Sequence, residues 1–145
     1  MSNSTLFSEV FKITKVNPDG KAFEKVTRFA AETIQYDISI LIDINTDVYP
    51  LRENDTFTLV LTNTINKDGS PDSGTYVDVS QKETLLDQYE YCMYGKVFKY
   101  EYKGNNKVLI YISFGGLLMS IEGDQRYLVN IKYGDRLYLL MRKMI

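Results

Sequence analysis

Apolar and polar residues alternate along much of this chain, which is the pattern of β-strands with one buried face. The clearest stretch is residues 36–44, where an isoleucine stands at every second position. One face carries Ile38, Ile40, Ile42 and Ile44, and the other carries Asp37, Ser39, Leu41 and Asp43. We predict that the isoleucine face belongs to the core and that the opposite face is mostly in water.

A glycine pair gives the strongest hairpin signal in the chain. Residues 107–114 and 117–122 are apolar, β-branched or aromatic runs, and Gly115 and Gly116 separate them. Neither glycine has a Cβ, so both can take a positive φ without steric cost. The sequence therefore predicts two antiparallel strands joined by a tight turn.

Further strands are predicted at residues 6–16, 23–32, 56–62, 92–102 and 136–143. The last strand is apolar on both faces, so we expect it to be buried on both sides. About eight antiparallel strands must hide their edges, and closure into a barrel is the simplest solution. We predict an all-β fold with one domain, residues 1–145: a single antiparallel β-barrel of about eight strands, similar to an OB-fold.

Two segments depart from the strand pattern. Residues 63–90 are polar and rich in turn formers at 66–74, which predicts a long surface loop, with a short helix over residues 81–89. Asp124 can cap a helix N-terminus, so a short helical turn is predicted from there through Val129.

The composition removes several kinds of chemistry. The 145 residues include no histidine and one cysteine, Cys92, which excludes an intrachain disulfide, histidine-based nucleophile pairs and zinc sites built on these residues. The N-terminal residues show no signal-peptide pattern, and no apolar run is long enough to span a membrane. We therefore expect no cofactor, no metal and no membrane association.

The charge is unevenly distributed along the chain. Residues 1–90 hold 8 basic and 15 acidic side chains, whereas residues 91–145 hold 9 basic and 4 acidic ones, and the net charge is −2. This balance argues against a protein that binds nucleic acid mainly through its global charge.

Six segments in order, covering nearly the whole chain, resemble one family. They are LFSEVF (6–11), VNPDGKAF (16–23) followed by VTR (26–28), LIDIN and VYP (41–50), YEYCMYGK (89–96), SFGGLLM (113–119) followed by Glu122-Gly123, and LLMRK (139–143). With these motifs the chain resembles the small OB-like β-barrel subunit shared by the eukaryotic nuclear RNA polymerases I, II and III. Two departures are Ser120, where the family usually has Arg, and Cys92, which replaces an aliphatic residue at a strand position that we predict to be buried.

The resemblance implies a non-catalytic subunit in the nucleus. It implies docking on the largest subunit of RNA polymerases I, II and III, away from the catalytic magnesium, in support of assembly and DNA-templated transcription. The residues that we predict to bind this partner are Tyr94, Gly95, Lys96, Phe114, Gly115, Gly116, Leu117, Leu118, Met119 and Arg142.

Each of these residues also has a purely structural interpretation. Turn chemistry alone explains Gly115 and Gly116, while the resemblance gives equal weight to the approach of a partner's backbone at this turn. A glycine inside a strand, such as Gly95, indicates a bulge or the close approach of another group, and we favour the bulge. Arg142 is either part of a solvated tail or an electrostatic contact at an interface rim.

The alternative function is a free OB-fold module that binds single-stranded nucleic acid. OB barrels do so with aromatic platforms in a basic groove, and the chain has 12 tyrosines. The acidic total and the lack of tryptophan weaken this hypothesis, so direct nucleic-acid contact is not expected. A small-molecule barrel would need convergent polar groups that the sequence does not supply. Asp43 and Asp47 are interpreted as solvated strand-end acids rather than as an acid–base pair.

Overall fold

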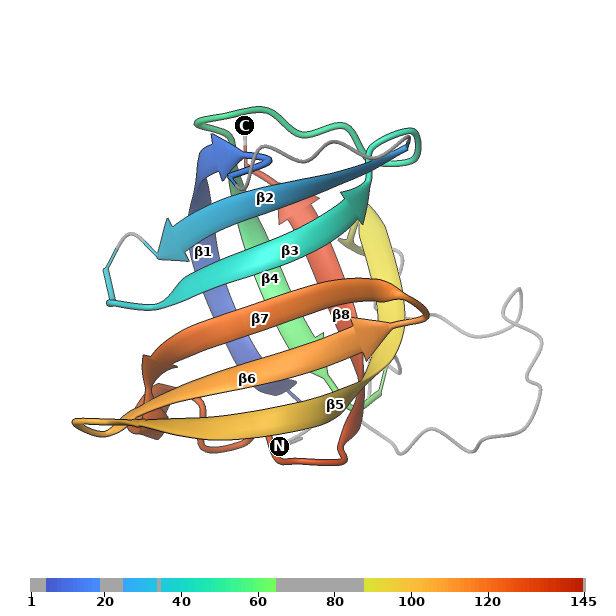
Figure 1. Ribbon diagram of the computed structural model, residues 1–145. Coiled ribbons are helices and arrows are strands. Elements are labelled where there is room, and N and C mark those ends of the chain that lie inside the picture. The colour runs from blue at the N-terminus through green and yellow to red at the C-terminus, as the bar shows by residue number, and fades with distance from the viewer. Residues whose placement is uncertain (1–4, 19–24, 34, 65–87, 145) are drawn as a thin grey trace, which may run out of the picture.

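The computed structural model describes residues 5–18, 25–33, 35–64 and 88–144, most of which lie in β-strands (Figure 1). The strands are β1 Thr5–Val16, β2 Val26–Thr33, β3 Ser39–Asn45, β4 Thr56–Thr62, β5 Tyr91–Gly104, β6 Lys107–Phe114, β7 Leu117–Asp124 and β8 Arg136–Lys143. The loop and the short helix predicted between residues 63 and 90 lie almost wholly outside the described residues.

The strands close into a barrel in the order β1-β2-β3-β7-β6-β5-β8-β4, and every neighbouring pair is antiparallel. Figure 1 shows β7, β6 and β5 wrapping one side of the barrel while β1, β4 and β8 cross behind them. The predicted all-β, closed antiparallel barrel is therefore confirmed. Closure pairs the strands on both sides, which removes the free edges that an open sheet would present.

The barrel interior is filled by the inward face of each strand. The four isoleucines that alternate from Ile38 to Ile44 expose at most 2% of their surface, as their spacing predicts. Three strands add Phe57, Ile112 and Leu139, which are fully buried. Burial of such side chains stabilises the fold by about 1.5–3 kcal/mol each.

The structure adjusts several of the predicted strand ends. β2 begins at Val26 because Lys25 has a φ of 68°, a turn conformation that cannot continue a strand. β3 begins at Ser39 because residues 35–37 form a bend, and Thr33 N–H donates to the Ile38 carbonyl across it at 3.0 Å. β4, β6 and β8 have the predicted bounds.

The predicted cap is present after β7. Asp124 Oδ1 accepts a hydrogen bond from the Arg126 backbone N–H at 3.0 Å, at the start of a 3-10 turn over Gln125–Tyr127. The turn ends two residues before Val129, since Leu128 takes a non-helical conformation there.

Candidate interaction face

Four outward side chains form a continuous row across the outside of the barrel. Arg136 on β8 pairs with Lys96 on β5, Lys96 pairs with Ser113 on β6, and Ser113 pairs with Leu118 on β7. Arg136, Lys96 and Leu118 are exposed, and Ser113 is half-buried. We call this set the outer row.

The predicted partner-binding residues divide between the surface and the core. The exposed ones are Tyr94, Lys96, Gly115, Gly116, Leu118 and Arg142, Leu117 is half-buried, and Gly95, Phe114 and Met119 are buried. Alternation causes this division, because successive residues of one strand point to opposite sides of the barrel wall. The structure places Lys96 and Leu118 in the outer row and Tyr94 in the cross-strand pair beside it, and Arg142 lies six residues further along β8 from Arg136.

Gly95 is required by the chain's own packing rather than by a bulge. A Cβ at this position would lie 2.3 Å from the Ser113 carbonyl oxygen and 2.5 Å from Phe114 Cδ1. The irregularity of β5 lies further on, where the pairing with β6 shifts between Val97 and Lys99. The bulge that we favoured at Gly95 is therefore wrong, and the close approach comes from the neighbouring strand β6.

The Gly115–Gly116 turn protrudes into open space. Their φ angles are 63° and 104°, and a Cβ on either would meet no atom within 4 Å. The hairpin prediction is confirmed, and both turn positions have a positive φ, which glycine adopts without steric cost. Because β6 and β7 are each paired on both sides, this hairpin offers no free strand edge to an incoming chain.

Asp43 is buried, which the sequence did not predict. Only 7% of the residue is exposed, and Arg28 donates to it twice, Nε to Oδ1 at 2.7 Å and Nη2 to Oδ2 at 3.1 Å. The same carboxylate accepts the backbone N–H of Leu118 at 3.0 Å. The interpretation of Asp43 as a solvated strand-end acid is therefore wrong, because the carboxylate extends the contact between β3 and β7 beyond the paired residues.

A second polar cluster fastens the chain where β5 begins and β8 ends. Glu90 Oε1 accepts the Tyr49 hydroxyl at 2.6 Å and the Lys143 backbone N–H at 2.9 Å. The Tyr49 hydrogen bond, followed by the Lys143 N–H, lowers the pKa of Glu90, and burial together with Glu90 raises the pKa of Tyr49 well above its usual value. The Tyr49 ring stacks on Tyr91 with 5.1 Å between centroids.

Cys92 faces outward and is exposed, so the buried strand position that we predicted for it is wrong. It follows the buried Tyr91 and precedes the half-buried Met93 on β5, and alternation sends its side chain to the outside.

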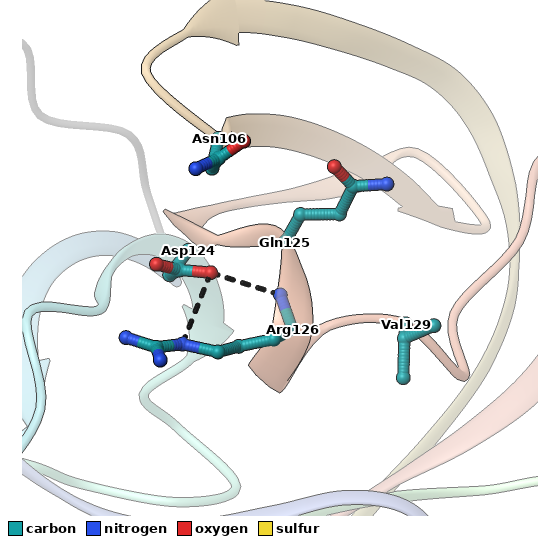
Figure 2. A pocket seen from close by; sticks show the side chains of 5 residues that line it. All are labelled: Asn106, Asp124, Gln125, Arg126 and Val129. Atoms are coloured by element: carbon teal, nitrogen blue, oxygen red, sulfur yellow. Dashed lines mark hydrogen bonds and ion pairs between the residues drawn. The ribbon is translucent and has the colours of Figure 1, made fainter.

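A hollow of about 440 Å³ lies beside the 3-10 turn (Figure 2). Asp124 accepts from the Arg126 backbone N–H and lies 3.5 Å from Arg126 Nε, so the charges in the hollow neutralise one another. The described residues contain no group of three or more acidic, cysteine or histidine side chains able to hold a metal ion. Within the same residues no helix has the length and apolarity needed to cross a membrane.

Comparison with known proteins identifies the family. The RNA polymerase Rpb8 family matches residues 8–143, and the chain belongs to this family of RNA polymerase subunits. One relative is subunit 8B of DNA-directed RNA polymerases II, IV and V from Arabidopsis thaliana, 43% identical over 145 residues and 99% of each chain. Another is subunit rpabc3 of DNA-directed RNA polymerases I, II and III from Dictyostelium discoideum, 43% identical over 97% of this chain and 98% of the relative. The Saccharomyces cerevisiae subunit RPABC3 is 35% identical over 99% of this chain and all of its own length.

Proposed function

We propose that this chain is a non-catalytic structural and assembly subunit common to the nuclear RNA polymerases I, II and III, and that it docks on the largest subunit of each. The observation that carries this proposal is the full-length similarity to subunits named for these polymerases. The closed barrel supports it, since a rigid body with a packed interior suits a bracing role in a larger complex.

The site geometry favours docking through side chains. The Gly115–Gly116 hairpin has no unpaired edge, so strand addition there would require the barrel to open. The exposed members of the predicted site are instead side chains on the outside of the barrel wall: Tyr94, Lys96 and Leu118, with Arg142 further along β8. A patch of this kind, apolar and aromatic with basic neighbours, is typical of interface cores and their rims.

Affinity purification of the tagged chain from a nuclear extract tests this proposal. We expect the largest subunits of all three polymerases to co-purify with the tagged chain at low salt. Recovery of the tagged chain without any polymerase subunit would contradict the proposal.

A further inference from the structure

Two cations of the outer row stand directly opposite each other. Lys96 on β5 and Arg136 on β8 are cross-strand partners, both point outward, and both are exposed. Like charges in this position destabilise a sheet. The barrel therefore carries an arrangement that does not favour its own stability.

Two acidic side chains have partners of their own: Asp135, next to Arg136 in the sequence, and Glu101, further along β5 from Lys96. Asp135 Oδ2 accepts the Lys132 backbone N–H at 3.0 Å, and Glu101 forms ion pairs with Lys99 and Lys103 at 2.9 and 3.8 Å. Throughout the part of the chain that the structure describes, no ion pair reaches Lys96 or Arg136. Among the described residues, the two positive charges therefore have no ion-pair partner.

Exposed apolar side chains lie two residues to either side of Lys96 along β5, and another ends the outer row on β7. Tyr94 is 48% exposed and contacts Tyr138, with 4.7 Å between the ring centroids, in the neighbouring cross-strand pair. Phe98 and Leu118 are 43% and 40% exposed on the same outer surface. Arginine and tyrosine are among the residue types that contribute most binding energy at protein interfaces, and Arg136 and Tyr94 bring the two types together here.

We propose that Lys96 and Arg136 form a paired-cation anchor for an acidic polypeptide segment of the largest polymerase subunit. This inference rests on the proposed function and names the chemistry of the contact. The guanidinium of Arg136 can bind a carboxylate through two parallel hydrogen bonds, and Lys96 adds a point charge beside it. Tyr94, in the adjacent cross-strand pair, and Leu118, at the far end of the outer row, would pack against the apolar residues that flank the acid.

The surface fits a protein acid better than a nucleic acid. A nucleic-acid backbone needs a series of cations along its path, whereas the outer row has one cation pair and continues to Ser113 and Leu118. The Tyr94 ring already packs against Tyr138, which leaves it a poor platform for an intercalated base.

Reversing the charge of Lys96 or Arg136 should affect stability and partner binding in opposite directions. In Arg136→Glu or Lys96→Glu the cross-strand pair becomes attractive, so we expect the midpoint of thermal unfolding of the isolated chain to stay unchanged or rise. The same variants should lower the yield of co-purified largest subunit at least about tenfold, because one charge of the anchor now repels the acid. Lys15→Glu, an exposed position on β1, is the matched control for net charge and should leave the yield unchanged.

Each outcome of this experiment decides the matter. Retention of the polymerase by Arg136→Glu and Lys96→Glu at the wild-type yield overturns the anchor but leaves the proposed function intact. Absence of the polymerase from the wild-type sample overturns both. If either variant has a lower unfolding midpoint, Arg136→Gln and Lys96→Gln replace them and must still reduce the yield. A single-stranded oligonucleotide is also titrated into each protein. If the wild-type chain and Lys15→Glu bind it and the Lys96 and Arg136 variants do not, the anchor is overturned in favour of a nucleic-acid site.

Discussion

A single carboxylate holds together two strands that are distant in sequence. Asp43, two residues before the end of β3, accepts hydrogen bonds from the side chain of Arg28 and from the backbone N–H of Leu118 near the start of β7. The pairing of β3 with β7 covers only Ser39 to Ile42 on β3. Asp43 therefore extends the contact between these two strands, which we call the β3–β7 seam, by one residue beyond their backbone pairing. The residue therefore fixes the position of Leu118 in the outer row.

Replacing Asp43 by asparagine should destabilise the barrel and loosen this seam. We expect a loss of about 1–3 kcal/mol in the free energy of unfolding, at the lower end because the Arg28 side chain is 32% exposed to solvent. Urea unfolding measures the loss, and hydrogen exchange at the Leu118 amide should accelerate more than at other β7 amides. Asp47→Asn, at an exposed position, is the control and should change neither quantity. Unchanged protection of Leu118 in Asp43→Asn would contradict this role.

Adding one methyl group at Gly95 should be costly. The new Cβ would lie 2.3 Å from a backbone oxygen of Ser113, so β5 and β6 would have to separate locally. We expect Gly95→Ala to lower the free energy of unfolding by about 1–3 kcal/mol, measured by urea denaturation. Shrinking Phe114 to leucine in the same chain should not restore stability, because the Ser113 clash is with backbone. Full rescue by that second change would show that only the Phe114 ring matters.

The sequence could show that residues such as Gly95 and Asp43 were unusual but not what they contacted. Gly95 was visible as a glycine inside a strand, yet its contact with Ser113 depends on the register between β5 and β6. Asp43 alternated with isoleucines as a water-facing residue would, and its partner Arg28 lies opposite it on β2. Such cross-strand partners follow from register, which local patterning does not encode.

At the scale of elements, period-two alternation and turn chemistry were sufficient for most strands. β4, β6 and β8 have the bounds that the sequence predicts, because each is a compact apolar run between clear turn residues. β2 and β3 begin later than predicted, after the left-handed Lys25 and the bend at 35–37, and these starts depend on single backbone angles. β5 and β7 run two residues past their predicted ends, to Gly104 and Asp124.

At the β6–β7 turn, the stability cost of a substitution should depend on the φ of the position and not on crowding by neighbouring atoms. Gly115 has a φ of 63°, which asparagine tolerates, so Gly115→Asn should leave the unfolding midpoint nearly unchanged. Gly116 has a φ of 104°, and Gly116→Val should cost about 1–2 kcal/mol, because L residues strain in this region. No atom crowds either position, so equal losses in both variants, measured by thermal denaturation, would contradict this account.

The Glu90 cluster should make the junction of β5 and β8 sensitive to acid. The pKa of Glu90 is lower in the folded chain than its ordinary value of 4.5. The stability that the Glu90 carboxylate contributes is therefore complete above about pH 4.5 and is lost as the pH falls through the folded pKa. Tyr49→Phe keeps the ring stacked on Tyr91 but removes the strongest hydrogen bond to Glu90. We expect NMR titration to show a higher Glu90 pKa in this variant. The same pKa in both proteins would refute the assignment of the shift to Tyr49.

At the scale of the whole molecule, closure and charge together determine how the barrel can bind a partner. Closure leaves the interior filled by apolar side chains and the hairpin β6–β7 without an edge, and we therefore propose that a partner binds the outside of the wall. The second half of the chain, net basic, supplies β5 and β8, whose outward faces meet at Lys96 and Arg136. Fold class was predictable from patterning, whereas this meeting of two distant segments required the three-dimensional arrangement.

Carbodiimide cross-linking of the affinity-purified polymerase, which activates a carboxylate so that a lysine amine forms an amide with it, tests the central claim most directly. The claim is that the chain braces the polymerase by docking the outer wall around β5 and β8 on the largest subunit. We predict that Lys96 and Lys99 of β5 form amide cross-links to acidic side chains of the largest subunit, while Lys12 and Lys15 of β1 form none to that subunit. Cross-links to the largest subunit that concentrate on Lys12 and Lys15, with Lys96 free, would contradict the account.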